Sequence, residues 1–300
     1  MAIVELQQVR KAYDTKIAVD SLSFRIEPGS MFGLLGPNGS GKTSSIRMMI
    51  GITVPDSGSV ELFDQPFDRK NLHRVGYLPE ERGLYKKMKV IDQLAFLGQL
   101  HGLDAATATK RAHHWCEKLE ITEAIPKKTE ELSKGMQQKI QFIAALLHEP
   151  ELIIMDEPFS GLDPVNATLL QDTLVDLRNQ GRTILFSTHR MDQVEKLCDA
   201  ICLIHRGHLV LSGAMQEIKS RYPKNRVQMV FEGDASFLNN NSVESFKNYN
   251  GMAEIKLRDG ADAQHLLAEA ISKARITRFE VMEPTLEEIF IETVGDRVDA

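Results

Sequence analysis

The 300-residue sequence has few cysteines and no surplus of basic residues. Its cysteines are odd in number, and Cys116, Cys198 and Cys202 have spacings typical of buried reduced thiols in a cytosolic protein. The formal net charge is −6, and the part from Arg221 onward, with 10 Lys and Arg against 14 Asp and Glu, is acidic too. Because neither part can neutralise many phosphates, we expect no nucleic acid among the partners.

The sequence also lacks a long apolar run. No segment reaches the roughly 18–20 apolar residues that a membrane-spanning helix needs. The first residues, 1–13, do not have the charged-then-apolar layout of a secretory signal. We therefore expect a cytoplasmic protein, which has to bind a partner if it works at a membrane.

Two kinds of apolar pattern predict strands in the first two thirds of the chain. Alternation with period two indicates strands that are buried on one face, at 22–26 and 60–62. Continuous apolar runs indicate strands buried on both faces, at 31–35, 152–155 and 183–187. The runs 201–204 and 208–211, joined through Arg206-Gly207, predict a hairpin.

Helical patterns lie between these strands. The segment of about 84–147 has no convincing strand and is interpreted as a helical insertion, although Gly98 weakens the helical pattern of Val90, Leu94 and Leu97. A second helix is expected at 110–119, where His113 and His114 are read as part of a helix face and not as metal ligands. A further helix is expected at 164–179.

The composition changes near residues 220–225. Beyond this point RVQMVFEG, MAEIKLRDG and ITRFEVM predict strands, while ADAQHLLAEAISKA and TLEEIFIETV predict helices. The chain is therefore predicted to hold an α/β domain at 1–220 and a small α+β domain at 221–300.

The segment after the first buried strand fits the pattern GxxxxGK[ST], which is typical of P-loop proteins. Backbone N–H groups of such a loop turn inward around phosphates, and the following helix adds its partial positive charge. Lys42 is expected to reach the β and γ phosphates of ATP, and Thr43 to hold Mg²⁺. The predicted nucleotide-binding residues here are Gly36, Pro37, Asn38, Gly39, Ser40, Gly41, Lys42, Thr43 and Ser44.

A second apolar strand, 152–155, delivers two carboxylates. P-loop ATPases place the carboxylate that directs Mg²⁺ at such a strand end, which is the role expected of Asp156. Glu157 is then well placed to accept hydrogen bonds from an attacking water and is the predicted catalytic residue, together with Lys42.

In this order, GPNGSGKT, LSKGM, LIIMDEP, SGLD and STH resemble the motifs of the ATP-binding cassette (ABC) ATPases, over about 3–211. The resemblance implies a P-loop core with an antiparallel β subdomain and a helical insertion. It also implies head-to-tail dimerisation, in which Ser133 and Gly135 complete the ATP site of a second copy. Further roles implied by the family are adenine stacking for Tyr13, dimer contact and nucleotide binding for Asp163, and catalysis as the γ-phosphate switch for His189.

Two positions depart from the family pattern. Glu80 stands where the family usually has Gln, and a carboxylate ligates Mg²⁺ more strongly than an amide. The implied metal ligands are thus Thr43, Glu80 and Asp156. In the LSKGM segment, Lys134 and Met136 replace the usual Gly and Gln.

The segments EPTLEEIF at 283–290 and LPEERGLY at 78–85 resemble exporter ATPases of the sodium-efflux and drug-efflux type. The resemblance implies a subunit at the cytoplasmic face of the cell membrane that powers a separately encoded permease. Leu84 and Tyr85 are interpreted as the joint to that permease, or else as packing under the insertion. Two other readings stay open: an ABC ATPase of translation or repair, and a regulatory module that binds ATP without turnover. The C-terminal domain has no cluster of polar residues that suggests catalysis, and is read as a packing or dimer-stabilising module.

Overall fold

The computed structural model describes residues 1–81, 83–222 and 224–298. Arg82 and Pro223, which fall within two of the segments discussed above, lie outside the described residues. The chain divides into two compact units, Met1–Met215 and Gln216–Ala300, a few residues before the boundary expected at 220. Each unit is described by itself.

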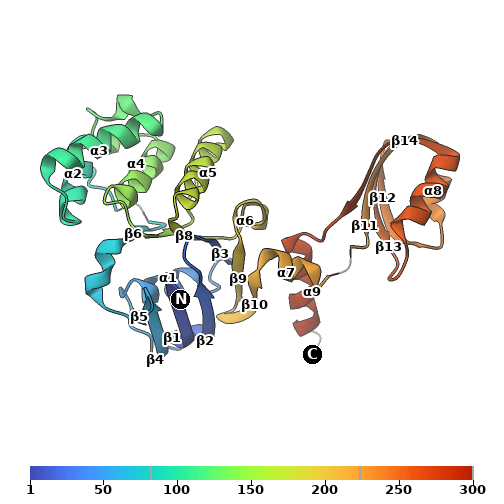
Figure 1. The fold of residues 1–300 in the computed structure, drawn as a ribbon, viewed down its shortest axis with the longest axis horizontal. Coiled ribbons are helices and arrows are strands. Elements are labelled where there is room, and N and C mark those ends of the chain that lie inside the picture. Colours follow the sequence, from blue (N-terminus) through green and yellow to red (C-terminus); the bar gives the residue numbers. More distant parts are fainter. Residues whose placement is uncertain (82, 223, 299–300) are drawn as a thin grey trace. The chain divides into compact units, whose positions relative to one another are not determined.

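A six-stranded sheet forms the centre of the first unit (Figure 1). Its order is β10-β9-β3-β8-β7-β6, with every neighbouring pair parallel except the β9–β10 hairpin. All residues of β3 (Met31–Leu35), β7 (Leu152–Asp156) and β8 (Thr183–Thr188) are buried, because both faces of a parallel sheet are covered. The other strands are β6 (Val75–Leu78), β9 (Ala200–His205) and β10 (His208–Ala214).

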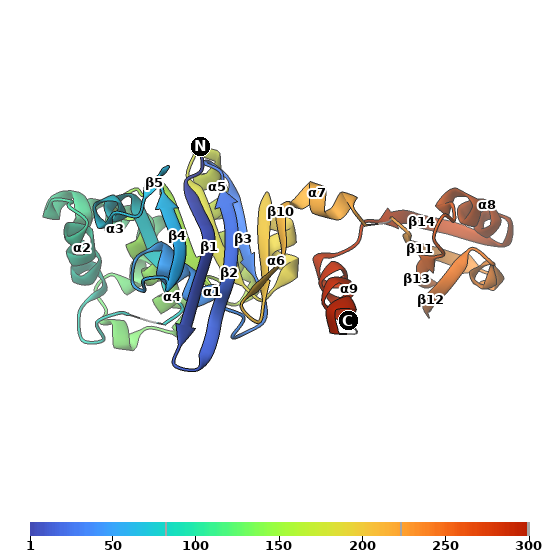
Figure 2. The ribbon, with the colours of Figure 1, turned by 90° about the horizontal axis from the view of Figure 1, so that it is seen from below.

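A second, antiparallel sheet has the order β2-β1-β4-β5, and Figure 2 shows β4, β1 and β2 side by side. The strands are β1 (Val4–Tyr13), β2 (Lys16–Ile26), β4 (Ser57–Leu62) and β5 (Gln65–Pro66). Helix α1 (Lys42–Met49) packs between the two sheets, since Ile46 and Met49 share one core with Leu6 and Ile154. This packing holds α1 in place, so that its first residue follows the loop after β3.

The helical insertion contains α2 (Val90–Leu100), α3 (Ala105–Lys118) and α4 (Lys134–Leu146). Helix α2 continues through Gly98, where the sequence pattern was weak. A Cβ at this position would lie 2.9 Å from the Cβ of Ala108, so the glycine lets α3 approach closely. His113 and His114 are exposed on α3, whereas Cys116 is buried on another side of the helix.

Three further short segments and two helices complete the first unit. Helices α5 (Pro164–Asn179) and α6 (Met191–Leu197) follow β7 and β8, and a 3₁₀ helix, Arg69–Arg74, precedes β6. The 3₁₀ turns Thr122–Ala124 and Thr129–Glu131 lie between α3 and α4. Within the described part of the chain, no helix has both the length and the hydropathy needed to cross a membrane.

The second unit is a four-stranded antiparallel sheet with helices. Its order is β12-β13-β11-β14, and α8 (Ala263–Lys273) contributes Leu266 and Ala270 to the core on one face. The strands are β11 (Arg226–Gly233), β12 (Val243–Tyr249), β13 (Met252–Leu257) and β14 (Ala274–Met282). A 3₁₀ turn, Ser236–Asn239, follows β11; α7 (Met215–Ser220) spans the division between the units, and α9 (Leu286–Val298) ends the described chain. The sequence patterns predicted all these strands except β12.

Candidate nucleotide site

The loop between β3 and α1 is held close to neighbouring backbone by its glycines. Gly36 and Gly41 have φ angles of 152° and 112°, which favour glycine. A Cβ on Gly36 would lie 2.1 Å from the carbonyl oxygen of Ile204, and one on Gly41 would lie 2.4 Å from that of Ala18. No side chain fits at either position, so both must be glycine for the loop to approach the neighbouring backbone this closely.

Helix α1 begins directly after this loop, and its first turn suits an anion. Gly41 is the N-cap residue, so no side chain caps the helix, and the first turn carries no acidic residue. The N–H groups of this turn therefore remain available to a ligand with negative charge.

Lys42, the first residue of α1, lies inside the site. Its Nζ donates hydrogen bonds to the carbonyl oxygens of Gly36 at 2.8 Å and Pro37 at 3.2 Å. Burial lowers the pKa of the Lys42 ammonium below its ordinary value, and the carboxylates of Glu157, Asp156 and Glu80 oppose this shift. These carboxylates thus favour the charged ammonium in a buried position.

A pocket of about 480 Å³ opens over this loop. It brings together residues that the sequence analysis predicted from four separate motifs: Tyr13, Asn38, Gly39, Gly41, Lys42, Thr43, Ser44, Glu80, Asp156 and Glu157. It also contains Lys16 and Ala18 of β2, which the sequence analysis missed. They reach the pocket because β2 pairs with β1 opposite Tyr13, and no sequence motif signals this pairing.

Asp156, at the end of β7, has one carboxylate oxygen engaged and one without a partner. Its Oδ1 accepts a hydrogen bond from the hydroxyl of Ser187 on β8. Its Oδ2 is buried and has no hydrogen-bond partner among the described residues. A hard cation prefers oxygen ligands, and the same pocket also holds the Thr43 hydroxyl and the Glu80 carboxylate. The donor set therefore fits Mg²⁺.

Glu157 adopts an unusual backbone conformation, with φ at 51°. Its N–H donates to both the carbonyl oxygen and the hydroxyl of Ser187, at 3.2 Å each. Its Oε1 lies 3.0 Å from Nδ1 of His189 and 3.9 Å from Nζ of Lys42. The Glu157 side chain is only 11% exposed, while that of His189 is 52% exposed. The Glu157 carboxylate is thus inside the site, and the His189 ring that contacts it is accessible from solvent.

The LSKGM segment (132–136, the signature loop) does not line this pocket. Ser133 is exposed and caps α4, its hydroxyl accepting the N–H of Met136 at 3.2 Å. Gly135 faces Leu162, since a Cβ there would lie 3.5 Å from the Leu162 side chain. Asp163 is likewise exposed and caps α5 through the N–H of Asn166. Within one chain, then, these predicted residues lie apart from the phosphate loop.

The beginning of α4 is nevertheless tied to the carboxylate-bearing loop. The buried side chain of Gln138 donates a hydrogen bond of 3.0 Å to the carbonyl oxygen of Pro158, the residue after Glu157. The sequence analysis did not identify Gln138. It lies two residues beyond the signature loop, and only the fold reveals its partner.

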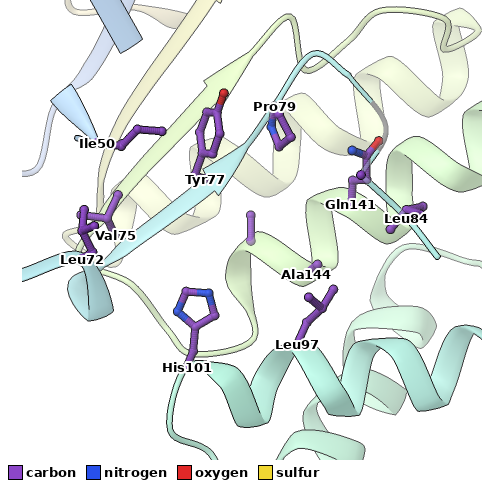
Figure 3. A pocket seen from close by; sticks show the side chains of 12 residues that line it. Ile50, Leu72, Val75, Tyr77, Pro79, Leu84, Leu97, His101, Gln141 and Ala144 are labelled. Atoms are coloured by element: carbon purple, nitrogen blue, oxygen red, sulfur yellow. The ribbon is translucent and has the colours of Figure 1, made fainter. Parts of the chain in front are cut away.

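A second, largely apolar pocket of about 340 Å³ lies between the sheet and the helical insertion (Figure 3). Leu72, Val75 and Tyr77 line one side, while Leu84 and Leu97 come from the insertion. His101 lies at one end and stacks on His148, with ring centroids 3.8 Å apart. This pocket is separate from the phosphate loop and offers apolar surface.

Comparisons with known proteins agree with this geometry. Residues 19–160 match the family model of the ABC transporter, and residues 213–294 match the C-terminal domain of DrrA1-3-like ATP-binding proteins. A solved structure described as an ATP-binding subunit of an ABC transporter superposes with a TM-score of 0.68 at 27% identity, covering 73% of this chain and 92% of that one.

Two relatives from Bacillus subtilis (strain 168) match nearly the whole chain. The uncharacterized ABC transporter ATP-binding protein YhaQ is 43% identical over 294 residues, covering 98% of this chain and 99% of the relative. The linearmycin resistance ATP-binding protein LnrL is 33% identical over 308 residues, covering 98% of each. With the phosphate loop, the paired carboxylates and the C-terminal unit in place, the chain belongs to the ATP-binding proteins of ABC transporters and has the P-loop fold of their ATPases.

Proposed function

We propose that this chain hydrolyses ATP to power a separately encoded membrane permease, as the ATP-binding subunit of an exporter. The observation that carries the proposal is the arrangement of two carboxylates around the phosphate loop. Asp156 offers a buried oxygen to a cation, and Glu157 has its carboxylate 3.9 Å from the ammonium of Lys42. Both line one pocket with the first turn of α1.

The roles of the individual residues follow from their positions. The loop 36–41 and the first turn of α1 would bind phosphate oxygens, and Lys42 would neutralise their charge. Thr43, Asp156 and Glu80 would hold Mg²⁺, which neutralises phosphate charge when bound. Tyr13, at the pocket mouth and 42% exposed, would stack on the adenine ring.

Glu157 would orient the attacking water and accept its proton. His189 supports this role because its Nδ1 is within hydrogen-bond distance of the Glu157 carboxylate and its ring reaches the surface. The imidazole would hold the carboxylate in place and contact the γ-phosphate from the open side of the site.

A second copy of the chain would supply the missing side of each site. Ser133 is exposed at the N-terminus of α4 but lies outside the pocket of its own chain, as does Asp163. A helix N-terminus with a hydroxyl suits a phosphate. In a head-to-tail homodimer, the signature loop of one chain would therefore cover the nucleotide of the other.

The permease would bind at the apolar pocket of Figure 3. Leu84 lines this pocket, and Tyr85 beside it is 55% exposed, with its ring 6.1 Å from that of Phe96. Exposed apolar surface next to a hollow is typical of a protein interface. The chain would thus act at the cytoplasmic face of the membrane, and the linearmycin resistance in the name of the relative LnrL supports an exporter.

The decisive experiment measures turnover in the wild type and in Glu157→Gln. We expect the purified wild type to hydrolyse MgATP and the variant to bind it but to lose turnover by about 10²–10⁴-fold, because the general base is gone. The variant should also accumulate as an ATP-bound dimer in size-exclusion chromatography.

Glu117→Gln, an exposed change of the same type on α3, is the control and should keep full activity. A wild type that binds MgATP without turnover would instead support a regulatory module. Turnover of Glu157→Gln within a few-fold of wild type would remove Glu157 from its role.

A further inference from the structure

Ser187 contacts both carboxylates of the site, although it does not line the nucleotide pocket. It lies on β8, is fully buried, and stands opposite Asp156 in the parallel register of β7 and β8. Paired residues on neighbouring strands point to the same face of a sheet, so the hydroxyl meets the Asp156 carboxylate directly.

The direction of these hydrogen bonds follows from the chemistry of the groups. A serine hydroxyl has one hydrogen, and an ionised carboxylate can only accept. The hydroxyl hydrogen therefore goes to Oδ1 of Asp156, and a lone pair of the same oxygen accepts the N–H of Glu157. One buried hydroxyl thus joins the two residues.

This arrangement has a consequence for each carboxylate. With Oδ1 of Asp156 engaged, the carboxylate cannot rotate freely, and Oδ2 is the oxygen left without a partner. Glu157 has a backbone conformation that non-glycine residues seldom adopt, so its orientation depends on surrounding contacts. Ser187 supplies two of them, through its carbonyl and hydroxyl oxygens.

We infer that Ser187 is a positioning residue that presents Oδ2 of Asp156 to the Mg²⁺ that accompanies the nucleotide, and fixes the backbone of Glu157 beside it. The inference rests on the proposed function. Ser187 touches neither the nucleotide nor the metal; it acts through the two carboxylates. Partners of this kind typically change metal affinity or activity by about 10–100-fold when removed.

The test compares binding of a non-hydrolysable ATP analogue, with Mg²⁺ or with EDTA, by isothermal titration calorimetry of the full chain. Wild type should bind more tightly with Mg²⁺ than with EDTA. Ser187→Ala should lose about 10-fold of this gain, while its affinity in EDTA stays within about 2-fold of wild type, because the phosphate loop is intact. ATP turnover should fall by about 10–100-fold.

Ser187→Thr and Ser187→Val form a matched pair of nearly equal size that differ in the hydroxyl. Thr should retain the Mg²⁺ gain and Val should lose it. Unfolding midpoints measured without nucleotide check that each variant is folded. If Ser187→Ala does not fold, the comparison of Ser187→Thr with Ser187→Val tests the positioning role.

The two levels of failure are distinguishable. A wild type that gains no affinity from Mg²⁺ would overturn the proposed nucleotide site. A wild type with that gain, together with a Ser187→Ala or Ser187→Val variant that keeps it in full, would overturn the positioning role alone.

Discussion

At the scale of single residues, His148 links the stability of the first unit to pH. Its Nε2 lies 3.0 Å from the carbonyl oxygen of Val75, and its ring stacks on that of His101. The pKa of His148 is lowered from an ordinary value of 6.5 to about 4, chiefly by burial and then by the neighbouring His101, while the hydrogen bond to the Val75 carbonyl opposes the shift. The folded protein therefore favours the neutral ring.

The sign of the pH dependence follows from this shift. Between about pH 4 and pH 6.5 the unfolded chain binds a proton that the folded chain does not. The free energy of unfolding therefore decreases as the pH is lowered through this window. Because the ring is partly exposed, we expect a contribution of about 2 kcal/mol, less than the full shift implies. Above pH 6.5 the contribution is complete.

Urea unfolding at pH 7 and pH 5 measures this effect. His148→Gln, which can still donate to Val75, should lose less stability on acidification than the wild type by about 1–2 kcal/mol. His113→Gln on the exposed face of α3 is the matched control and should follow the wild type. Equal losses in all three proteins would contradict the prediction.

Some residues of the site could be predicted from the sequence, and others could not. Lys42 and Thr43 belong to a contiguous motif, and Asp156 and Glu157 follow a recognisable buried strand, so their meeting in one pocket was predictable. Ser187 was not, since its role depends on the register of two strands 31 residues apart along the chain. Contacts set by register leave no local pattern.

At the scale of elements, segments with a clear alternating or continuous apolar pattern were predicted, whereas β1, β6 and the exposed β12 were not. Strand β12 was missed because only Val243 at its start is buried, so its side chains show no alternation. Gly98 weakened the helical pattern of a segment that was nevertheless predicted as helix and is helix α2. Its lack of a side chain lowers helix propensity locally, yet it allows α2 and α3 to pack closely.

The N-terminus of α4 supports a prediction about the proposed dimer. If the signature loop serves the partner's site, Lys42→Ala and Ser133→Arg damage the same composite site when they stand on opposite chains. A mixture of the two variants should then regain ATP turnover above either variant alone, because each heterodimer keeps one intact site. Turnover is measured after mixing and re-equilibrating the purified proteins.

A second mixture supplies the control. Lys42→Ala with Glu157→Gln places one defect in each composite site, so this mixture should stay inactive. Recovery in both mixtures would argue against the head-to-tail arrangement. Recovery in neither would mean either that this arrangement is wrong or that turnover requires both sites to be intact.

At the scale of the whole molecule, Tyr85 tests the proposed connection to the permease. Its side chain is 55% exposed and its N–H is bonded to the side chain of Gln93, so the ring can be removed while this backbone contact remains. Tyr85→Ala should keep ATP turnover of the isolated subunit within about 2-fold, but should uncouple it from transport in the reconstituted complex.

Tyr249→Ala is the control, since this tyrosine of the second unit is equally exposed at 55%. It should leave both activities intact. Loss of folding or of turnover in isolated Tyr85→Ala would assign the residue to packing under the insertion. The measurements are thermal unfolding, ATP turnover and transport in vesicles.

The hydrogen bond between Gln138 and Pro158 would connect the two nucleotide sites of the proposed dimer. In that dimer the helix that begins at Ser133 would contact the partner's nucleotide, and the same helix is hydrogen-bonded through Gln138 to Pro158, next to its own Glu157. A single amide group therefore links two reactions that share no atoms. Turnover at the two sites would then be coupled, and loss of the Gln138 side chain would weaken that coupling.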